Sequence, residues 1–144
     1  MERAADAALL AEKDRLAGAV YAAGLAVEGM LRSLVWTRDK HLDERHDLRR
    51  LAVRVESLGL LRRGAADEAF VTLIQDIARG WHNNLRFAAE DQLFRWWTEV
   101  GVLSKATGRA GARQCKKFLS QCTDAIRRCE TLWQRQPKSG SKRS

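Results

Sequence analysis

The sequence contains little of what interrupts a helix. Only one proline, Pro137, occurs in 144 residues, and Ala, Leu, Arg and Glu dominate over β-branched residues. These residues have high helix propensity, and a chain that is 45% hydrophobic and of this length can build one domain with a real core. We therefore predict an all-α domain over residues 1–136. The polar, basic end at 137–144 (PKSGSKRS) has no means of burying surface and is expected to be a disordered tail.

Cysteine is scarce, and the spacing of the three cysteines excludes a common metal site or a disulfide between them. Cys115, Cys122 and Cys129 are spaced seven residues apart. On one helix, successive members lie about 10 Å from each other, which is too far for a common zinc ion or a disulfide. We expect them to be small hydrophobic residues on one packed helix face. Free cysteines and the lack of a basic-then-apolar leader favour a cytoplasmic protein.

Histidines and catalytic motifs are also scarce. His41, His46 and His82 form no pair at metal-binding helical spacing, and the chain has neither a Gly-rich phosphate loop nor a nucleophile elbow. The motifs therefore predict no metal site, no cofactor and no catalytic residue. His46 is expected to cap or pack at the start of a helix.

Charge is nearly absent from Leu16–Trp36, which carries only Glu28 and Arg32. A bilayer span is disfavoured because both charges lie well inside this stretch. Apolarity on almost every side predicts a helix buried in a bundle. The two charges are four residues apart and share one helix face, so they either satisfy each other or open onto a common polar pocket.

Apolar periodicity predicts further helices on both sides of this one. They are expected at about 4–12, 46–58, 67–78, 88–103 and 112–134, with polar connections at 37–45 and 104–111. Within 88–103, Trp96 and Trp97 are adjacent and point about 100° apart, so both cannot be central to one core. One reading places them, with the cysteine stripe, at a dimer interface.

Positive charge is concentrated near the end of the chain. The net charge is +8, but residues from Gly101 onward hold 11 Lys/Arg against 2 Asp/Glu, so the first hundred residues carry −1. Such a basic end favours nucleic acid or an acidic partner, or it is simply a solvated helix with a basic tail.

One segment, Trp81–Phe87 (WHNNLRF), is rich in amides and aromatic rings and has no clean period. Aromatic rings stack on bases, Arg binds phosphate and Asn reads base edges, so the segment is a candidate nucleotide site. The alternative is a kinked helix junction whose polar groups satisfy exposed backbone.

Three elements together resemble the HEPN domain (higher eukaryotes and prokaryotes nucleotide-binding). They are the Ala-rich helix Ala19–Ser33 (AVYAAGLAVEGMLRS), the His46–Leu48 (HDL) start of the next helix with Leu51, and Trp81–Phe87. The resemblance covers about residues 4–130.

The resemblance implies an antiparallel helical bundle of four to five main helices that forms a homodimer. It also implies the binding of a nucleotide or RNA, as in components of toxin–antitoxin pairs or partners of nucleotidyltransferase-like proteins. The polar residues of the matching elements are then the nucleotide-binding candidates, and several of them are expected to converge on one pocket. The candidates are Glu28, Arg32, His46, Trp81, Asn84 and Arg86. Arg32 and Arg86 would meet phosphate, Trp81 would stack or form a wall, and His46 would hydrogen-bond.

The nuclease members of the family carry an Arg followed by four to six residues and a His. Here Arg38 and His46 enclose seven residues, and Arg79 and His82 enclose two. The sequence therefore favours binding over catalysis. Two alternatives stay open: a metal-independent ribonuclease toxin with His46 or His82 as general acid or base, and a non-catalytic dimeric interaction module.

Overall fold

The chain folds into helices only, as the composition predicts. The computed structural model describes residues 2–12, 15–41, 46–61 and 64–136, and within these it contains no strand. The helices are α1 (Glu2–Glu12), α2 (Leu16–Trp36), α3 (Leu48–Ser57), α4 (Ala65–Arg79), the 3-10 helix η1 (Asn83–Phe87), α5 (Glu90–Glu99) and α6 (Gly108–Gln134). The expected four to five main helices become six α-helices here, because the short α1 and α5 are separate elements. The expected tail at 137–144 lies outside the described residues.

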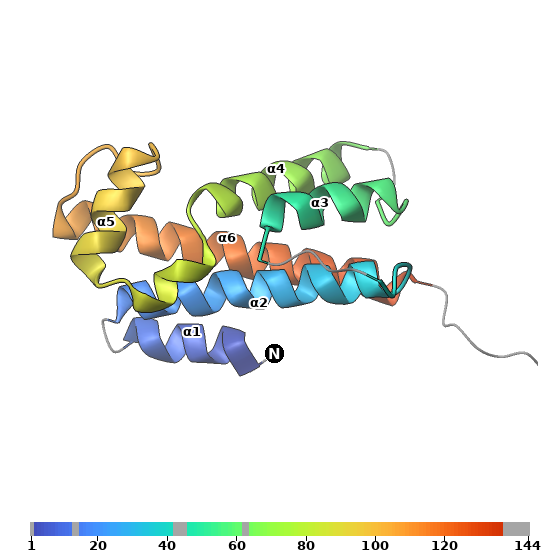
Figure 1. Ribbon diagram of the computed structural model, residues 1–144, viewed down its shortest axis with the longest axis horizontal. Coiled ribbons are helices and arrows are strands. Elements are labelled where there is room, and N and C mark those ends of the chain that lie inside the picture. The colour runs from blue at the N-terminus through green and yellow to red at the C-terminus, as the bar shows by residue number, and fades with distance from the viewer. Residues whose placement is uncertain (1, 13–14, 42–45, 62–63, 137–144) are drawn as a thin grey trace, which may run out of the picture.

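The two longest helices form the centre of the molecule. Figure 1 shows α2 and α6 side by side along the long axis, with α1 against one side of α2 and the α3–α4 pair on the opposite side. Helix α5 crosses the end of the molecule at which α2 and α6 begin. Helix α2 contacts α1, α3, α5, α6 and η1.

The central position of α2 explains why its sequence is apolar on most sides. It has buried residues on every turn, among them Val20, Val27, Leu31 and Leu34, which are fully buried. Within the described residues it is the one helix long and apolar enough to cross a bilayer, and half of that apolar stretch is buried inside the bundle. The bounds predicted for this helix are confirmed.

Local sequence signals set the ends of several helices. Asp47 caps α3 by accepting a hydrogen bond from Arg50 N (3.1 Å). Gly59 and Gly101 follow α3 and α5 with φ of 66° and 72°, the left-handed conformation that closes a helix with a Schellman turn. In the turn at Gly101, after α5, Val102 N donates to Trp97 O at 2.8 Å.

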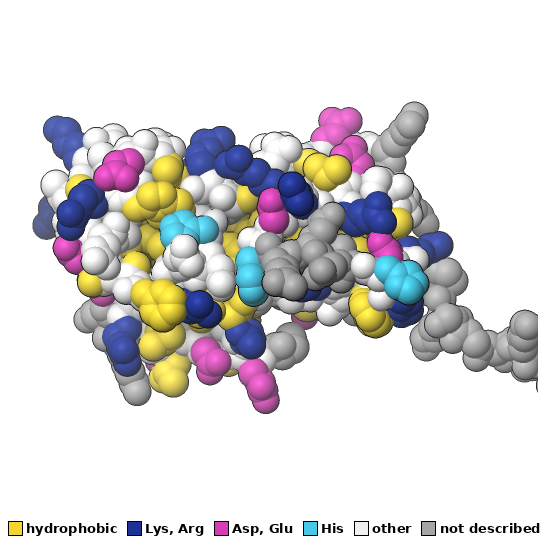
Figure 2. Space-filling view, viewed as in Figure 1, with side chains coloured by type: hydrophobic (Ala, Val, Ile, Leu, Met, Phe, Trp, Pro, Cys, Tyr) yellow, Lys and Arg dark blue, Asp and Glu magenta, His cyan; other side chains and the backbone are white. Residues whose placement is uncertain are grey.

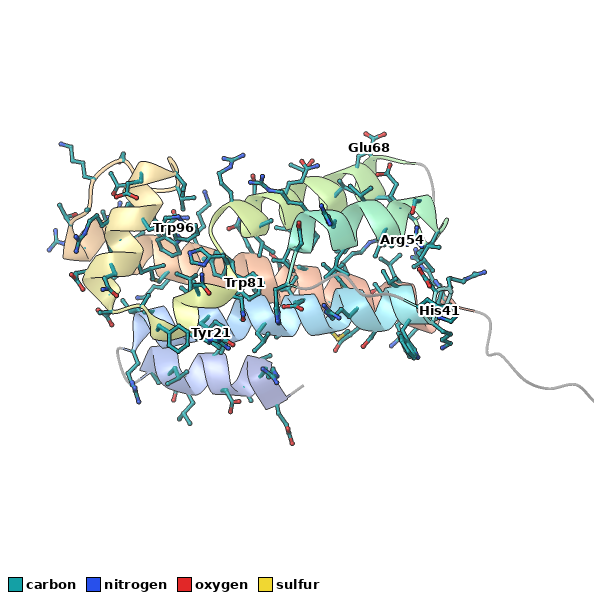
Figure 3. The ribbon with its side chains drawn as sticks, viewed as in Figure 1. Tyr21, His41, Arg54, Glu68, Trp81 and Trp96 are labelled. Atoms are coloured by element: carbon teal, nitrogen blue, oxygen red, sulfur yellow. The ribbon has the colours of Figure 1, made fainter. Side chains whose placement is uncertain are left out.

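The turn after α2 is fastened to α3. Asp39 accepts from Arg54 Nη2 at 2.5 Å and from His41 N at 2.9 Å. The Arg54 guanidinium holds the pKa of this carboxyl below its usual value. Figure 3 shows Arg54 and His41 at the end of the bundle where α2 finishes. This contact fixes α3 beside α2 and so positions the start of α3 near the middle of α2.

The three cysteines lie on the buried face of α6, which confirms the prediction of a packed stripe. Cys115, Cys122 and Cys129 are at most 1% exposed and form no disulfide. They share this face with Phe118, Ala125 and Leu132. They act as small hydrophobic side chains that allow α6 to approach its neighbours closely.

Because the three cysteines are buried, we expect their thiols to react slowly with alkylating reagents. Burial raises the pKa of Cys115 and Cys129 to about 12, which at about pH 8 lowers the thiolate fraction roughly a thousandfold relative to an exposed thiol. We expect alkylation by iodoacetamide, followed by mass spectrometry, to occur only as fast as the protein unfolds. Addition of denaturant should expose all three cysteines together. Rapid alkylation of any of them in the folded protein would contradict the buried stripe.

Candidate functional site

A buried carboxylate at the middle of α2 holds a guanidinium and an imidazole. Glu28 is 3% exposed, and both of its oxygens are engaged. Oε1 accepts from Arg32 Nε at 2.8 Å, one turn further along the helix, and Oε2 lies 2.9 Å from His46 Nδ1. The sequence left open whether Glu28 and Arg32 satisfy each other or share a polar pocket. In the structure they pair with each other, and His46 from another segment joins the pair.

The two partners of Glu28 remain accessible to solvent. The side chains of Arg32 and His46 are 35% and 46% exposed, so their charged or polar ends can meet a ligand while Glu28 fixes their positions. The helical spacing of four residues accounts for the first contact, whereas the meeting of His46 with Glu28 was expected only from the resemblance of the motifs.

The backbone of His46 is held in an unusual conformation. Its φ of 51° lies in the left-handed region, and among the described residues it is the one non-glycine residue with positive φ. Such a conformation costs an L-residue about 1–2 kcal/mol. His46 immediately precedes Asp47, the N-cap of α3, so the strained residue joins the polar cluster on α2 to the start of α3. Strain of this kind is concentrated at functional sites.

A groove of 510 Å³ runs along the outer face of α2 beside this cluster. It is lined by Glu28, Gly29, Arg32 and neighbouring residues of α2, by the first turn of α1 and by Ile126 of α6. A side chain added at Gly29 would meet nothing within 4 Å, so this glycine leaves the floor of the groove open. The groove has the volume of a small-molecule site and is lined by charged residues of both signs together with apolar surface.

Trp81 takes a structural position rather than a ligand-binding one. Its side chain is 4% exposed and packs against Gly24, where an added Cβ would lie 2.2 Å from the indole ring. The indole Nε1 donates to Tyr21 O at 3.1 Å, and the two rings are stacked with centroids 6.5 Å apart. Figure 3 shows Tyr21 and Trp81 together where η1 meets the first half of α2. A ring enclosed in this way has no face left for a base.

Apart from the buried Leu85, the other residues of WHNNLRF lie at least partly on the surface. Asn84 and Arg86 are exposed, and Arg86 lies over the ring of Phe87, 4.5 Å from its centroid. Phe87 is 75% exposed. In the view of Figure 2, hydrophobic side chains gather over α5 and η1. Arg86 lines a smaller groove of 260 Å³ with Arg15 and Tyr21, which is not the groove that Arg32 lines.

His82 serves the junction between α4 and η1. Its Nδ1 accepts from Asn84 N at 3.2 Å, which caps η1, and its ring meets the ring of Trp96 edge-on at 4.5 Å. Burial lowers the pKa of His82, so the neutral form is favoured. The alternative of a helix junction whose polar groups satisfy the backbone describes this residue well.

The six candidate nucleotide-binding residues do not all lie together. The structure brings Glu28, Arg32 and His46 together by direct contacts. Trp81 packs against Gly24, which lies one turn before Glu28 on α2. Arg86 lines a different groove. Glu28, Arg32 and His46 thus meet, as expected of several of the six, whereas Trp81 is buried and the expectation that Arg86 joins Arg32 was wrong.

The alternative that placed Trp96, Trp97 and the cysteines at a dimer interface does not fit the burial of Trp97 and the cysteines within one chain. Trp97 is fully buried and donates from Nε1 to Gly80 O at 2.9 Å, and the cysteines are enclosed within the bundle. Trp96 is half-buried. The expectation that the two adjacent tryptophans differ in burial is confirmed.

Several features of the groove had no signal in the sequence. Glu2 and Arg3 reach it only because α1 folds back along α2, and Gly29 is one of ten glycines without a distinguishing pattern. Within the described part of the chain, no group of three His, Cys, Asp or Glu side chains could hold a metal ion.

Comparison with protein-family models, with curated proteins and with solved structures finds no match for this chain.

Proposed function

We propose that this helical bundle binds a nucleotide, or the phosphate groups of an RNA, at the groove beside Glu28, Arg32 and His46. The observation that carries this proposal is the buried Glu28 carboxylate, whose two oxygens hold a half-exposed guanidinium and a half-exposed imidazole in fixed positions. A guanidinium forms strong, charge-assisted hydrogen bonds to phosphate oxygens. The HEPN-like motifs support the same class of ligand.

The groove offers separate surfaces for the parts of a nucleotide. Arg32 and Ser33 provide donors on one side, and Leu25 and Ile126 provide apolar surface for a base or ribose. The open floor at Gly29 allows a ligand to approach the helix backbone closely. Binding in this groove requires no movement of Trp81.

Two substitutions test the proposal by different means. We expect Arg32→Gln to weaken the binding of AMP, ATP or GTP roughly 10- to 100-fold in equilibrium dialysis, because a charge-assisted hydrogen bond contributes about 1.5–3 kcal/mol. Gly29→Leu should block the groove without changing any charge, whereas the matched Gly29→Ala should leave the affinity within about twofold. Melting curves establish that each variant folds. Undiminished binding by both Arg32→Gln and Gly29→Leu, or no binding of any of these nucleotides by the unaltered chain, would refute the proposal.

Ribonuclease activity is a second candidate, favoured by one observation. Glu28 holds His46 through Nδ1, which leaves Nε2 as the nitrogen that can face a substrate, and Arg32 lies on the same carboxylate. The test is incubation with total RNA in the presence of EDTA. His46→Asn is the informative variant, because asparagine tolerates the left-handed backbone. RNA that stays intact with the unaltered chain removes this candidate.

A further inference from the structure

The first half of α6 and the turn before it form a surface that carries positive charge only. Between Glu99 and Asp124 the chain contains five cations and no carboxylate. All five are exposed: Lys105, Arg109, Arg113, Lys116 and Lys117. We call these five residues the basic stripe.

The cations of the basic stripe have no acidic partner in the part of the chain that the structure describes, whereas several exposed arginines elsewhere do. Four exposed arginines elsewhere pair with an aspartate three or four residues earlier in the chain: Arg50, Arg79, Arg95 and Arg127. Among the described residues, no ion pair or side-chain hydrogen bond involves Arg109, Arg113, Lys116 or Lys117. Their charge is therefore not used to hold the fold together.

The helix arranges these charges on one side. Arg109, Arg113, Lys116 and Lys117 fall within an arc of about 100° and span about 12 Å along the axis. Their mutual repulsion is unfavourable, and Arg109 lies in the first turn, where the helix dipole also disfavours a cation. Figure 2 shows Lys and Arg side chains at the end of the molecule where α6 begins. An arrangement that costs stability and supports no internal contact fits an external anion.

We propose that the basic stripe binds the phosphate backbone of a nucleic-acid strand, without regard to base sequence. Regularly placed, flexible cations are what such contacts require. A membrane surface or an acidic protein would also need apolar anchors. No large hydrophobic side chain is exposed between Val100 and Trp133, so the stripe does not offer them.

This surface is separate from the groove at Glu28. Ile126 marks the groove on α6, and Lys117, the nearest residue of the basic stripe, lies nine residues earlier, or about 13 Å along the axis. The stripe is also turned away from Ile126 by roughly a quarter of the helix circumference or more. The proposal therefore stands whether or not the groove binds a mononucleotide.

The test measures fluorescence anisotropy of a labelled single-stranded RNA of about 20 nucleotides over a range of salt concentrations. Contacts from four cations predict a slope of log affinity against log salt of about −3, which is roughly a 50-fold loss between about 50 and 200 mM. Replacing Arg109, Arg113, Lys116 and Lys117 with Gln should reduce the affinity at least tenfold and remove most of that slope.

A matched variant controls for net charge. Replacing Lys40, Arg49, Arg95 and Arg135 with Gln also removes four exposed cations, but from four different places. This control should retain most of the affinity. Equal losses in both quadruple variants would overturn the proposal, as would no RNA binding by the unaltered chain. Equal or tighter binding to polyglutamate or to vesicles of anionic lipid would assign the stripe to a different partner and also overturn it.

Discussion

Replacing Gly24 with alanine is expected to lower the free energy of unfolding by about 2–3 kcal/mol. The new Cβ would lie 2.2 Å from Cδ1 and 2.3 Å from Nε1 of Trp81, closer than any real contact allows. The indole cannot easily move, because it is buried and hydrogen-bonded to Tyr21 O. Overpacking of a core in this way typically costs about 1–3 kcal/mol and occasionally more.

Gly29 provides the matched control, since it lies on the same helix and its added Cβ would meet only open space. Alanine has a higher helix propensity than glycine, so Gly29→Ala should raise stability by up to about 1 kcal/mol. Denaturation in urea would measure both variants. If Gly24→Ala were as stable as Gly29→Ala, the close approach of Trp81 to α2 would be contradicted.

Removing the carboxylate of Asp67 is expected to cost about 3 kcal/mol. Asp67 is 6% exposed and accepts a hydrogen bond from Arg128 Nη2, which joins α4 to α6. Arg128 Nε is buried and has no hydrogen-bond partner in the described part of the chain. Asp67→Ala would therefore leave a partly buried guanidinium without its counter-charge, and breaking a buried pair from one side costs about 3–5 kcal/mol. The expected cost lies at the low end of this range because the Arg128 side chain is still 24% exposed.

Asp124 provides the matched control, because it forms an ion pair with an arginine at the surface. Its pair with Arg127 is on α6 as well, but both side chains are more than half exposed. Asp124→Ala should cost no more than about 0.5 kcal/mol. Thermal melting would compare the two, and Arg128→Met combined with Asp67→Ala should recover part of the loss. A cost for Asp67→Ala no larger than that for Asp124→Ala would show that the α4–α6 pair does not support the fold.

Much of the fold was predictable because its signals are local. The apolar run Leu16–Trp36 specified a buried helix whose ends match those observed, and the seven-residue spacing of the cysteines placed them on one inward face of α6. Asp47 and Thr107 are N-caps of residue types that favour this position, although His46 was the cap proposed for α3 and α6 was expected to begin near 112. Periodicity and capping act within a few residues, so one sequence is sufficient to read them.

The candidate site was only partly predictable. The pairing of Glu28 with Arg32 follows from helical spacing alone. The third member, His46, comes from a different segment, and its contact depends on the path of the chain from α2 to α3 and on a left-handed backbone. The expected contribution of Arg86 failed because a 3-10 turn, rather than a continued helix, follows Gly80 and directs Arg86 to another groove.

The same distinction applies to the positive charge. The sequence located an excess of cations after Gly101, but it did not show which of them share a surface. Helix α6 places four of them on one exposed arc, while Arg128 turns inward to Asp67. The tertiary structure thus separates cations that stabilise the fold from cations that have no internal partner.

The sequence by itself determined that this protein is all-helical, that a nearly uncharged helix lies at its centre, and that its thiols are buried, because each property depends on residues close together in the chain. Only the tertiary structure decided which distant residues meet. It brought His46 to the buried Glu28, closed Trp81 against Gly24 and, among the residues it describes, left Arg109, Arg113, Lys116 and Lys117 without an ion pair. The physical reason is that burial and ion pairing depend on how helices pack, and many packings are compatible with one pattern of helices.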